Sequence, residues 1–238
     1  MFGVYLNMKI LNQINSPTFK SRPICPLNLK KTTGIGDFLS VVFSKLDPGD
    51  AEDVLAIKRI QNTWKDFSTI TCICPSFLKM AEIFKDKSSF VYHCIEIPRA
   101  KSTLLKRAEI SFDDEQDLSQ RAVSLITSGF DPETRKFTLY YVATKDEYQF
   151  ENEWRPLKNI GEVAMGAVIN EAKKAGASSF CFKAAQDGFY EKIFERAGIL
   201  FDKNNHDFTV AQAQFDKYIK YIQQKFCIDF SKQLSLEA

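Results

Sequence analysis

Apolar residues recur along the chain at two spacings, and each spacing marks a different part of the fold. In residues 51–64 they return every three or four positions, which predicts an amphipathic helix with Asp50 as its N-cap. Residues 1–36 show neither spacing and contain three prolines, so we predict an irregular N-terminal arm there. Residues 39–43 form a short apolar run that suits either a strand or a helical turn.

The middle of the chain changes to the spacing of strands. Residues 90–97 are nearly all apolar or aromatic, as in a strand buried on both faces. Residues 108–112 alternate between apolar and polar side chains. Two further strands are predicted at residues 121–127 and 136–144, and the Gly, Asp and Pro residues at 129–132 indicate that they form a hairpin. We therefore expect three or four consecutive strands that are mostly antiparallel.

Helical spacing returns in the last third of the chain. Residues 160–175 predict a long amphipathic helix that ends at Gly176, and residues 188–197 predict a second helix after a short strand. Two short strands, predicted at residues 199–202 and 208–211, flank a polar turn at residues 203–207, and residues 215–226 predict a final helix. The fold class is therefore α/β (α+β): a mixed, mostly antiparallel sheet flanked by helices, with an N-terminal arm and a C-terminal helix.

Composition places the chain among globular proteins and narrows its partners. Its 238 residues fit one domain, which we assign to residues 37–238. A formal charge of +2 gives no reason to expect nucleic acid, and no apolar run approaches the roughly 18 residues that span a membrane. The chain has two histidines and six cysteines without a paired metal-ligand spacing, so we expect reduced thiols and no metal site.

The start of the helix predicted at residues 160–175 carries the first candidate chemistry. Gly161 lies in its first turn, where the backbone N–H groups have no partner inside the helix. The missing side chain of Gly161 lets a ligand approach these groups, and the helix dipole favours an anion there. Lys173 and Lys174, in the last turn, suit the opposite end of the dipole. The sequence therefore predicts a site for the diphosphate of a cofactor.

The segment from Leu157 to Ile199 resembles the acetyl-CoA-binding half of the GNAT superfamily of N-acetyltransferases. Members carry Arg or Gln, two residues, Gly, one residue, then Gly or Ala at a strand-to-helix junction whose backbone binds the cofactor diphosphate. Here Lys158 stands at the first position, Gly161 at the glycine and Val163 at the last position, with Ala164 beside it. The resemblance implies a GNAT-like fold with acetyl-CoA as the cofactor. The implied cofactor contacts are Lys158, Asn159, Ile160, Gly161, Glu162, Val163 and Ala164.

The resemblance extends to the strand before this helix, so that the cofactor-binding half covers about residues 137–212. The strand at residues 137–143 resembles the fourth strand of the family. The end of that strand separates from its neighbour and pairs with the pantetheine arm through backbone groups. In this chain the resemblance gives that role to Val142 and Ala143.

The second helix of the segment carries the residues for proton transfer. Phe194 stands where many family members have a tyrosine that donates a proton to the departing CoA thiolate. Phenylalanine cannot donate a proton, and Tyr190, one turn earlier on the same side, is the substitute. Many acetyltransferases also use a glutamate on the central strands to take the proton of the amine. Glu109, which points outward from the strand predicted at residues 108–112, is the candidate for that base.

The resemblance implies an acyl-CoA-dependent N-acyltransferase. It would move an acetyl group from acetyl-CoA to an amine of a small molecule or a protein. Two alternatives stay open: a catalytically inactive GNAT-like module for binding or regulation, and a non-enzymatic α/β protein-interaction factor. We further expect a cytoplasmic protein without nucleic-acid or membrane partners. A homodimer is one oligomeric state that we consider.

Overall fold

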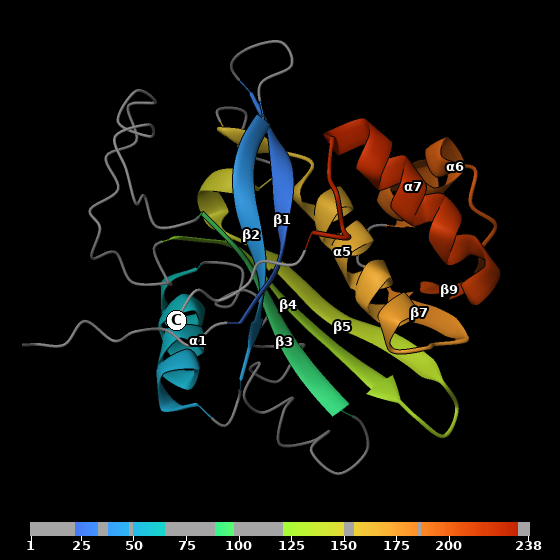
Figure 1. The fold of residues 1–238 in the computed structure, drawn as a ribbon, viewed down its shortest axis with the longest axis horizontal. Helices are drawn as coiled ribbons and strands as arrows, with labels where there is room; N and C mark the ends of the chain where they lie inside the picture. Colours follow the sequence, from blue (N-terminus) through green and yellow to red (C-terminus); the bar gives the residue numbers. More distant parts are fainter. Residues whose placement is uncertain are drawn as a thin grey trace, which may run out of the picture.

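The computed structural model shows a sheet of nine strands in the order β6-β1-β2-β3-β4-β5-β7-β9-β8, with helices on both of its faces (Figure 1). It describes residues 22–32, 38–47, 50–64, 89–97, 121–149, 155–184 and 187–232. The strands are β1 (Arg22–Lys31), β2 (Phe38–Leu46), β3 (Ser89–Glu96), β4 (Ala122–Asp131), β5 (Lys136–Thr144), β6 (Leu157–Lys158), β7 (Ser179–Lys183), β8 (Asp202–Asn204) and β9 (Asp207–Ala211). The α-helices within these ranges are α1 (Ala51–Thr63), α5 (Ile160–Lys174), α6 (Asp187–Ala197) and α7 (Phe215–Phe226).

One pair of neighbouring strands in the sheet, β5 and β7, is parallel, and the other pairs are antiparallel. Strands β1 to β5 pair antiparallel in chain order, and β6 pairs antiparallel with β1 at the edge. Strand β5 then pairs in parallel with β7, and the connection between them contains α5, because parallel neighbours need a crossover. Strands β7, β9 and β8 are antiparallel again. The predicted class, a mixed and mostly antiparallel sheet flanked by helices, is confirmed.

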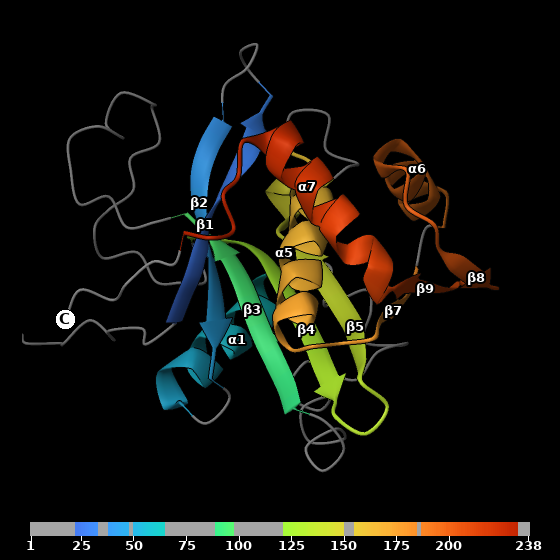
Figure 2. The same ribbon diagram turned by 45° about the vertical axis from the view of Figure 1, so that its right-hand side comes forward.

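The two faces of the sheet carry two separate apolar cores. The larger core joins the sheet to α5, α6 and α7, and its fully buried members include Val163, Phe180 and Phe194. The smaller core joins the opposite face to α1 through residues such as Ile57 and Tyr92. Figure 2 shows α5 and α7 in front of the sheet and α1 behind it. Apolar burial on both sides therefore fixes which helix lies on which face.

The predicted helices match the structure closely because each has a clear periodic stripe and a defined end. The N-cap predicted for α1 is present, since the Asp53 N–H donates to Asp50 Oδ1 at 3.3 Å. Helix α5 ends before Gly176, which has a φ of 74°. That left-handed backbone suits glycine and stops the helix where the sequence predicts.

The prediction of an irregular arm over residues 1–36 is wrong for residues 22–31, which form β1 and belong to the sheet. Pro23 and Pro26 hide this strand in the sequence because proline breaks a hydrogen-bonded ladder. Strand β1 pairs with β6 only at Lys30 and Lys31, so its first part is an edge where prolines are tolerated. The register also shifts between Pro23 and Cys25.

Three further predictions concern short strands. The apolar run at residues 39–43 is part of a strand, β2, rather than a helical turn. The first strand of the last hairpin, predicted at residues 199–202, lies at Asp202–Asn204 instead. The strand predicted at residues 108–112 lies outside the described residues. No helix in the described ranges is long and apolar enough to cross a bilayer.

Candidate cofactor site

The first turn of α5 is open at its N-terminus. Asn159 precedes the helix with a φ of 64°, a left-handed conformation that asparagine adopts more readily than most residues, and its side chain makes no capping hydrogen bond. The first intrahelical bond runs from the Val163 N–H to the Asn159 carbonyl at 3.0 Å. The N–H groups of Ile160 and Gly161 therefore have no acceptor inside the helix, as is usual in a first helical turn.

Strand β5 extends beyond its parallel neighbour. The last residue that it pairs with β7 is Leu139, opposite Phe182, although β5 continues to Thr144. The pairing of β5 with β4 also shifts register between Leu139 and Tyr141, which leaves Tyr140 as an inserted residue. A bulge of this kind bends a strand. The end of β5 thus separates from β7, as the resemblance to the GNAT superfamily implies for this strand.

Only alternate residues of β5 turn their backbone toward the open edge. The Lys145 N–H donates to the Val123 carbonyl at 3.0 Å, so position 145 faces β4. Position 143 faces β4 as well, because strand residues alternate, and the Ala143 carbonyl accepts a hydrogen bond from Ser124 Oγ at 2.7 Å. Val142 and Thr144 are therefore the residues that direct N–H and C=O groups toward the β7 side. Backbone pairing of Val142 with a ligand stays a prediction. The same alternation makes Thr144 a second candidate for this pairing.

Helix α6 connects the end of β7 to the first turn of α5. The Tyr190 ring lies 4.7 Å from the Phe182 ring of β7 and 5.1 Å from the neighbouring Phe189 ring. A Cβ atom placed on Gly161 would lie 3.7 Å from the Phe189 ring, which is ordinary contact. The predicted phosphate-binding turn and the predicted proton donor are thus joined through one aromatic side chain.

Tyr190, the predicted proton donor, lies at the edge of the larger core. Burial raises the pKa of its phenol above the usual value, so the hydroxyl stays protonated at neutral pH. Its ring packs against the larger core, yet the residue is only partly buried. Phe194, at the position where the family has tyrosine, is fully buried and packs edge-on against Tyr218 at 5.5 Å. Tyr190 is the tyrosine that α6 itself contains, and its role as the proton donor stays a prediction.

The other predicted contacts divide into surface and core groups. Lys158 lies in β6, and it is partly exposed immediately before the open turn. Ile160, Val163 and Ala164 bury their side chains in the larger core, so any contact with a cofactor would come from their backbone. Val163 thus points away from the open turn. Glu109 lies outside the described residues, so its role as a base stays a prediction.

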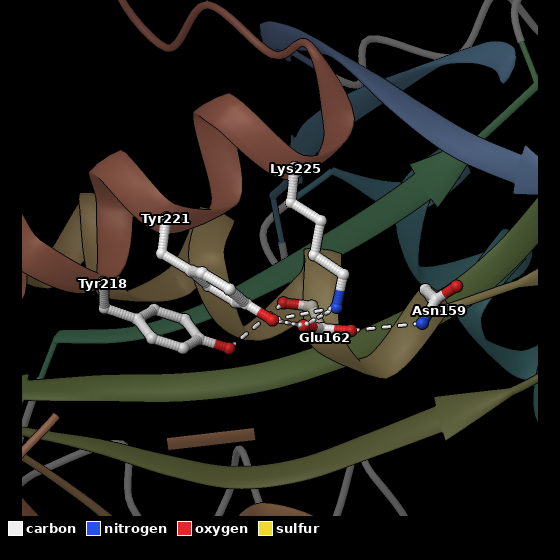
Figure 3. A network of polar contacts seen from close by, with 5 residues as sticks. All are labelled: Asn159, Glu162, Tyr218, Tyr221 and Lys225. Atoms are coloured by element: carbon white, nitrogen blue, oxygen red, sulfur yellow. Dashed lines mark hydrogen bonds and ion pairs between the residues drawn. The ribbon is translucent and has the colours of Figure 1, made fainter. Parts of the chain in front are cut away.

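A polar network that the residue pattern did not predict surrounds Glu162 (Figure 3). Glu162 Oε1 accepts hydrogen bonds from Lys225 Nζ at 2.6 Å and from the Tyr221 hydroxyl at 2.8 Å. Asn159 Nδ2 donates to Glu162 Oε2 at 3.1 Å, and the Tyr218 hydroxyl lies 3.5 Å from the Glu162 carbonyl oxygen. The network joins the first turn of α5 to α7, from Tyr218 in the first turn of α7 to Lys225 in its last turn.

Charge in this network is balanced. Burial alone lowers the pKa of Lys225, but its bonds to Glu162 and Tyr221 outweigh that effect and leave the pKa raised. Lys225 is therefore a cation, and its side chain is 32% exposed against 2% for Glu162. The described residues hold no cluster of His, Cys, Asp or Glu suited to a metal ion.

The chain matches no protein-family model and no curated protein sequence. It resembles solved structures in outline. A cAMP-binding acyltransferase from Mycobacterium smegmatis is 16% identical, with 84% of this chain covering 56% of that one at a TM-score of 0.39. GCN5 from Tetrahymena is 11% identical, with 71% of this chain covering 94% of that one at a TM-score of 0.42. The NatC complex bound to Gag peptide and CoA gives 10% identity, 72% and 98% coverage and a TM-score of 0.42.

Solved GNAT acetyltransferases are thus among the structures that the chain resembles, and GNAT is also the superfamily that its sequence resembles. At these identities and TM-scores the likeness concerns the arrangement of elements alone and says nothing of activity or substrate. The chain also spans little more than half of the M. smegmatis acyltransferase.

Proposed function

We propose that the protein is an acyl-CoA-dependent N-acyltransferase that transfers an acetyl group from acetyl-CoA to an amine of a small molecule or a protein. One observation carries the proposal. The edge of β5 beyond Leu139 and the uncapped first turn of α5 both adjoin the segment from the end of β7 to the start of α6, because Leu139 pairs with Phe182 and a Cβ atom on Gly161 would contact Phe189. An extended ligand with amide groups at one end and phosphates at the other fits such a site.

Each half of that ligand would bind to groups that complement it in hydrogen bonding or charge. The pantetheine amides would extend the sheet as an added strand along β5, using the backbone of Val142 and Thr144. The diphosphate would accept hydrogen bonds from the N–H groups of Ile160 and Gly161, at the positive end of the α5 dipole. Lys158 adds a cation beside that turn.

The chemistry needs little beyond this placement. The acceptor nitrogen attacks the thioester carbonyl carbon, the carbon–sulfur bond breaks, and the acyl group remains on the nitrogen. Tyr190 would give its phenolic proton to the departing CoA sulfur, and a base would take the proton that the nitrogen loses. Holding amine and thioester in line would supply much of the acceleration.

Binding is tested by following the unfolding temperature with CoA and with acetyl-CoA. A ligand that binds the native state alone must raise the midpoint, so millimolar ligand should raise it by several degrees. Gly161→Glu should remove the rise without unfolding the protein, because its side chain fills the approach to the turn with negative charge. Gly161→Ala is the matched control, since its Cβ makes only ordinary contact. Absence of any rise in the wild type would contradict the proposal and favour the protein-interaction factor.

Catalysis is tested by release of free CoA thiol from acetyl-CoA with a panel of amines. Tyr190→Phe should slow turnover by roughly 100-fold, in the range of general acid catalysis, and leave CoA affinity unchanged. Phenylalanine keeps the ring contacts with Phe182 and Phe189, so folding is preserved. An unchanged rate would remove Tyr190 as the acid.

A second candidate is a CoA-binding module without catalysis. Phe194 favours it, because the position that is a tyrosine in many family members is here an apolar part of the core. That candidate predicts a rise in unfolding temperature with CoA but no thiol release with any amine tested.

A further inference from the structure

Glu162 places a negative charge in the same helical turn that the proposed function assigns to an anionic cofactor. Its side chain is 2% exposed, and it belongs to the first turn of α5 together with Ile160 and Gly161. An anion bound by the N–H groups of that turn would lie close to the carboxylate. Like charges repel strongly where water is scarce, so the turn would reject the cofactor unless a cation balances Glu162.

Lys225 provides the balancing charge from the C-terminal helix. Its Nζ lies 2.6 Å from Glu162 Oε1 and donates to the Tyr221 hydroxyl at 2.8 Å. The Tyr221 hydroxyl donates in turn to the same carboxylate oxygen at 2.8 Å. Figure 3 shows both side chains reaching down from α7 to the start of α5. The closed triangle of contacts makes the first turn of α5 electrically neutral overall.

The position of Lys225 is held from a third element. Asn28 of β1 donates from its Nδ2 to the Phe226 carbonyl at 3.1 Å and to the Cys227 carbonyl at 2.8 Å. These two carbonyl groups lie at the end of α7, where no N–H group of the helix is available to donate to them. The last turn of α7 is thereby tied to the sheet, and Lys225 stays directed at Glu162.

We propose that Lys225 is a positioning residue for the CoA site: it acts through Glu162, whose negative charge it cancels, and thereby admits the cofactor diphosphate to the first turn of α5. The inference rests on the proposed function. A lysine that only held α7 against α5 would give a different result. If Lys225 cancels the charge of Glu162, then Glu162→Gln should preserve CoA affinity; if Lys225 only holds the helices together, then Glu162→Gln should weaken it.

The test measures the dissociation constant of CoA by isothermal titration calorimetry in a double-mutant cycle. Lys225→Met should weaken binding at least ten-fold, since it leaves the buried carboxylate uncompensated. Glu162→Gln should bind as tightly as the wild type or several-fold more tightly. The double variant Glu162→Gln/Lys225→Met should return to within about three-fold of the wild type, because it removes both charges. Sodium chloride should shrink the defect of Lys225→Met by screening the repulsion.

Two control variants separate charge from folding. Lys220→Met removes an exposed lysine of the same helix and should leave CoA affinity within about two-fold of the wild type. Lys225→Arg keeps the cation and should retain most of the affinity. Circular dichroism at the titration temperature confirms that each variant is folded.

The outcomes distinguish this inference from the proposed function. If the wild type binds no CoA, the proposed function fails and the inference fails with it. If the wild type binds CoA and Lys225→Met binds equally well, only the role of Lys225 is refuted. If Glu162→Gln fails to restore binding to folded Lys225→Met, the lysine acts on the ligand or the fold rather than through Glu162, and the inference is likewise overturned.

Discussion

The two faces of the sheet each bury a glutamate, and the two glutamates are paired in different ways. Glu96 of β3 follows Tyr92 and Cys94 in the strand alternation and so faces the α1 side. Its Oε2 lies 2.8 Å from Arg121, with side-chain exposures of 6% and 7%. Glu162, on the opposite face, pairs with Lys225, whose side chain is 32% exposed. One pair is enclosed, and the other keeps its cation in reach of water.

The difference indicates different roles. The partners of the Glu96 pair lie within the sheet and its connections: Ser44 Oγ donates to Glu96 Oε1 at 2.7 Å, and Arg121 also donates to the Ile97 carbonyl at 3.1 Å. An enclosed pair of this kind can respond to a ligand only if the core opens. The pair around Glu162 lies at the uncapped start of α5, where an anion of the proposed kind would change its charge balance. We therefore expect the first pair to govern stability and the second to govern binding.

Removing the arginine of the enclosed pair should give the largest loss of stability. Arg121→Met leaves the Glu96 carboxylate buried without its cation, which costs about 3–5 kcal/mol of unfolding free energy. Lys225→Met should cost less, about 1–2 kcal/mol, because water reaches that pair. Urea unfolding of both variants measures the two losses.

The double variant Glu96→Gln/Arg121→Met is the control for this prediction. It removes both charges and should recover part of the stability lost in Arg121→Met. Equal losses for Arg121→Met and Lys225→Met would contradict the contrast between an enclosed pair and a water-accessible one.

The contact between α5 and α7 should be the next most sensitive feature. A Cβ atom on Gly166 would lie 2.8 Å from Ile222 Cγ2 and 2.9 Å from Ile222 Cγ1, closer than packed atoms allow. Gly166→Ala should therefore push the helices apart and destabilise the protein by about 1–3 kcal/mol. Because the shift displaces α7, it should also weaken the Glu162–Lys225 pair.

Gly161→Ala, in the first turn of the same helix, is the matched comparison. Its Cβ would make ordinary contact with Phe189, and alanine favours the helix over glycine by up to about 1 kcal/mol. Its unfolding free energy should thus equal or exceed that of the wild type. A loss at Gly161 as large as that at Gly166 would mean that helix packing does not explain the effect.

The sequence predicted the parts of this site that depend on local pattern. The range of β5, the start of α5 and the glycine in its first turn all follow from periodicity and from residue types within one segment. Strand β1 was missed because its prolines are tolerated only where the sheet has an edge, and an edge is a property of the assembled sheet.

The Glu162 network could not be predicted for a similar reason. A glutamate in the first turn of a helix is usually read as a solvated residue that suits the dipole. Its burial depends on α7 packing over that turn, and Tyr221 and Lys225 belong to a helix whose stripe predicts only an apolar face. Likewise, the direction of the Ala143 carbonyl toward β4 required the hydrogen-bond register of the strand.

The last expected effect is a dependence of stability on pH through His93, which lies on the larger core's side of β3. Its ring stacks on Phe43 at 4.7 Å, and its Nδ1 has no hydrogen-bond partner among the described residues. Burial, with a smaller contribution from Lys45, lowers its pKa from 6.5 to about 3. The folded protein therefore keeps this ring neutral under mildly acidic conditions.

The unfolding free energy should accordingly decrease as the pH falls below 6.5, and His93→Phe should remove this part of the decrease. Above pH 6.5 neither state binds the proton; between pH 6.5 and about 3 the unfolded chain binds it and the folded protein does not. From about pH 7.5 to about pH 5.5 the wild type should lose about 1.4 kcal/mol more unfolding free energy than His93→Phe. His206→Gln changes the other histidine of the chain, which is exposed, and should keep the wild-type loss. Parallel curves for wild type and His93→Phe would show that the ring is solvated in the folded state and that this face of the sheet is less enclosed than its packing indicates.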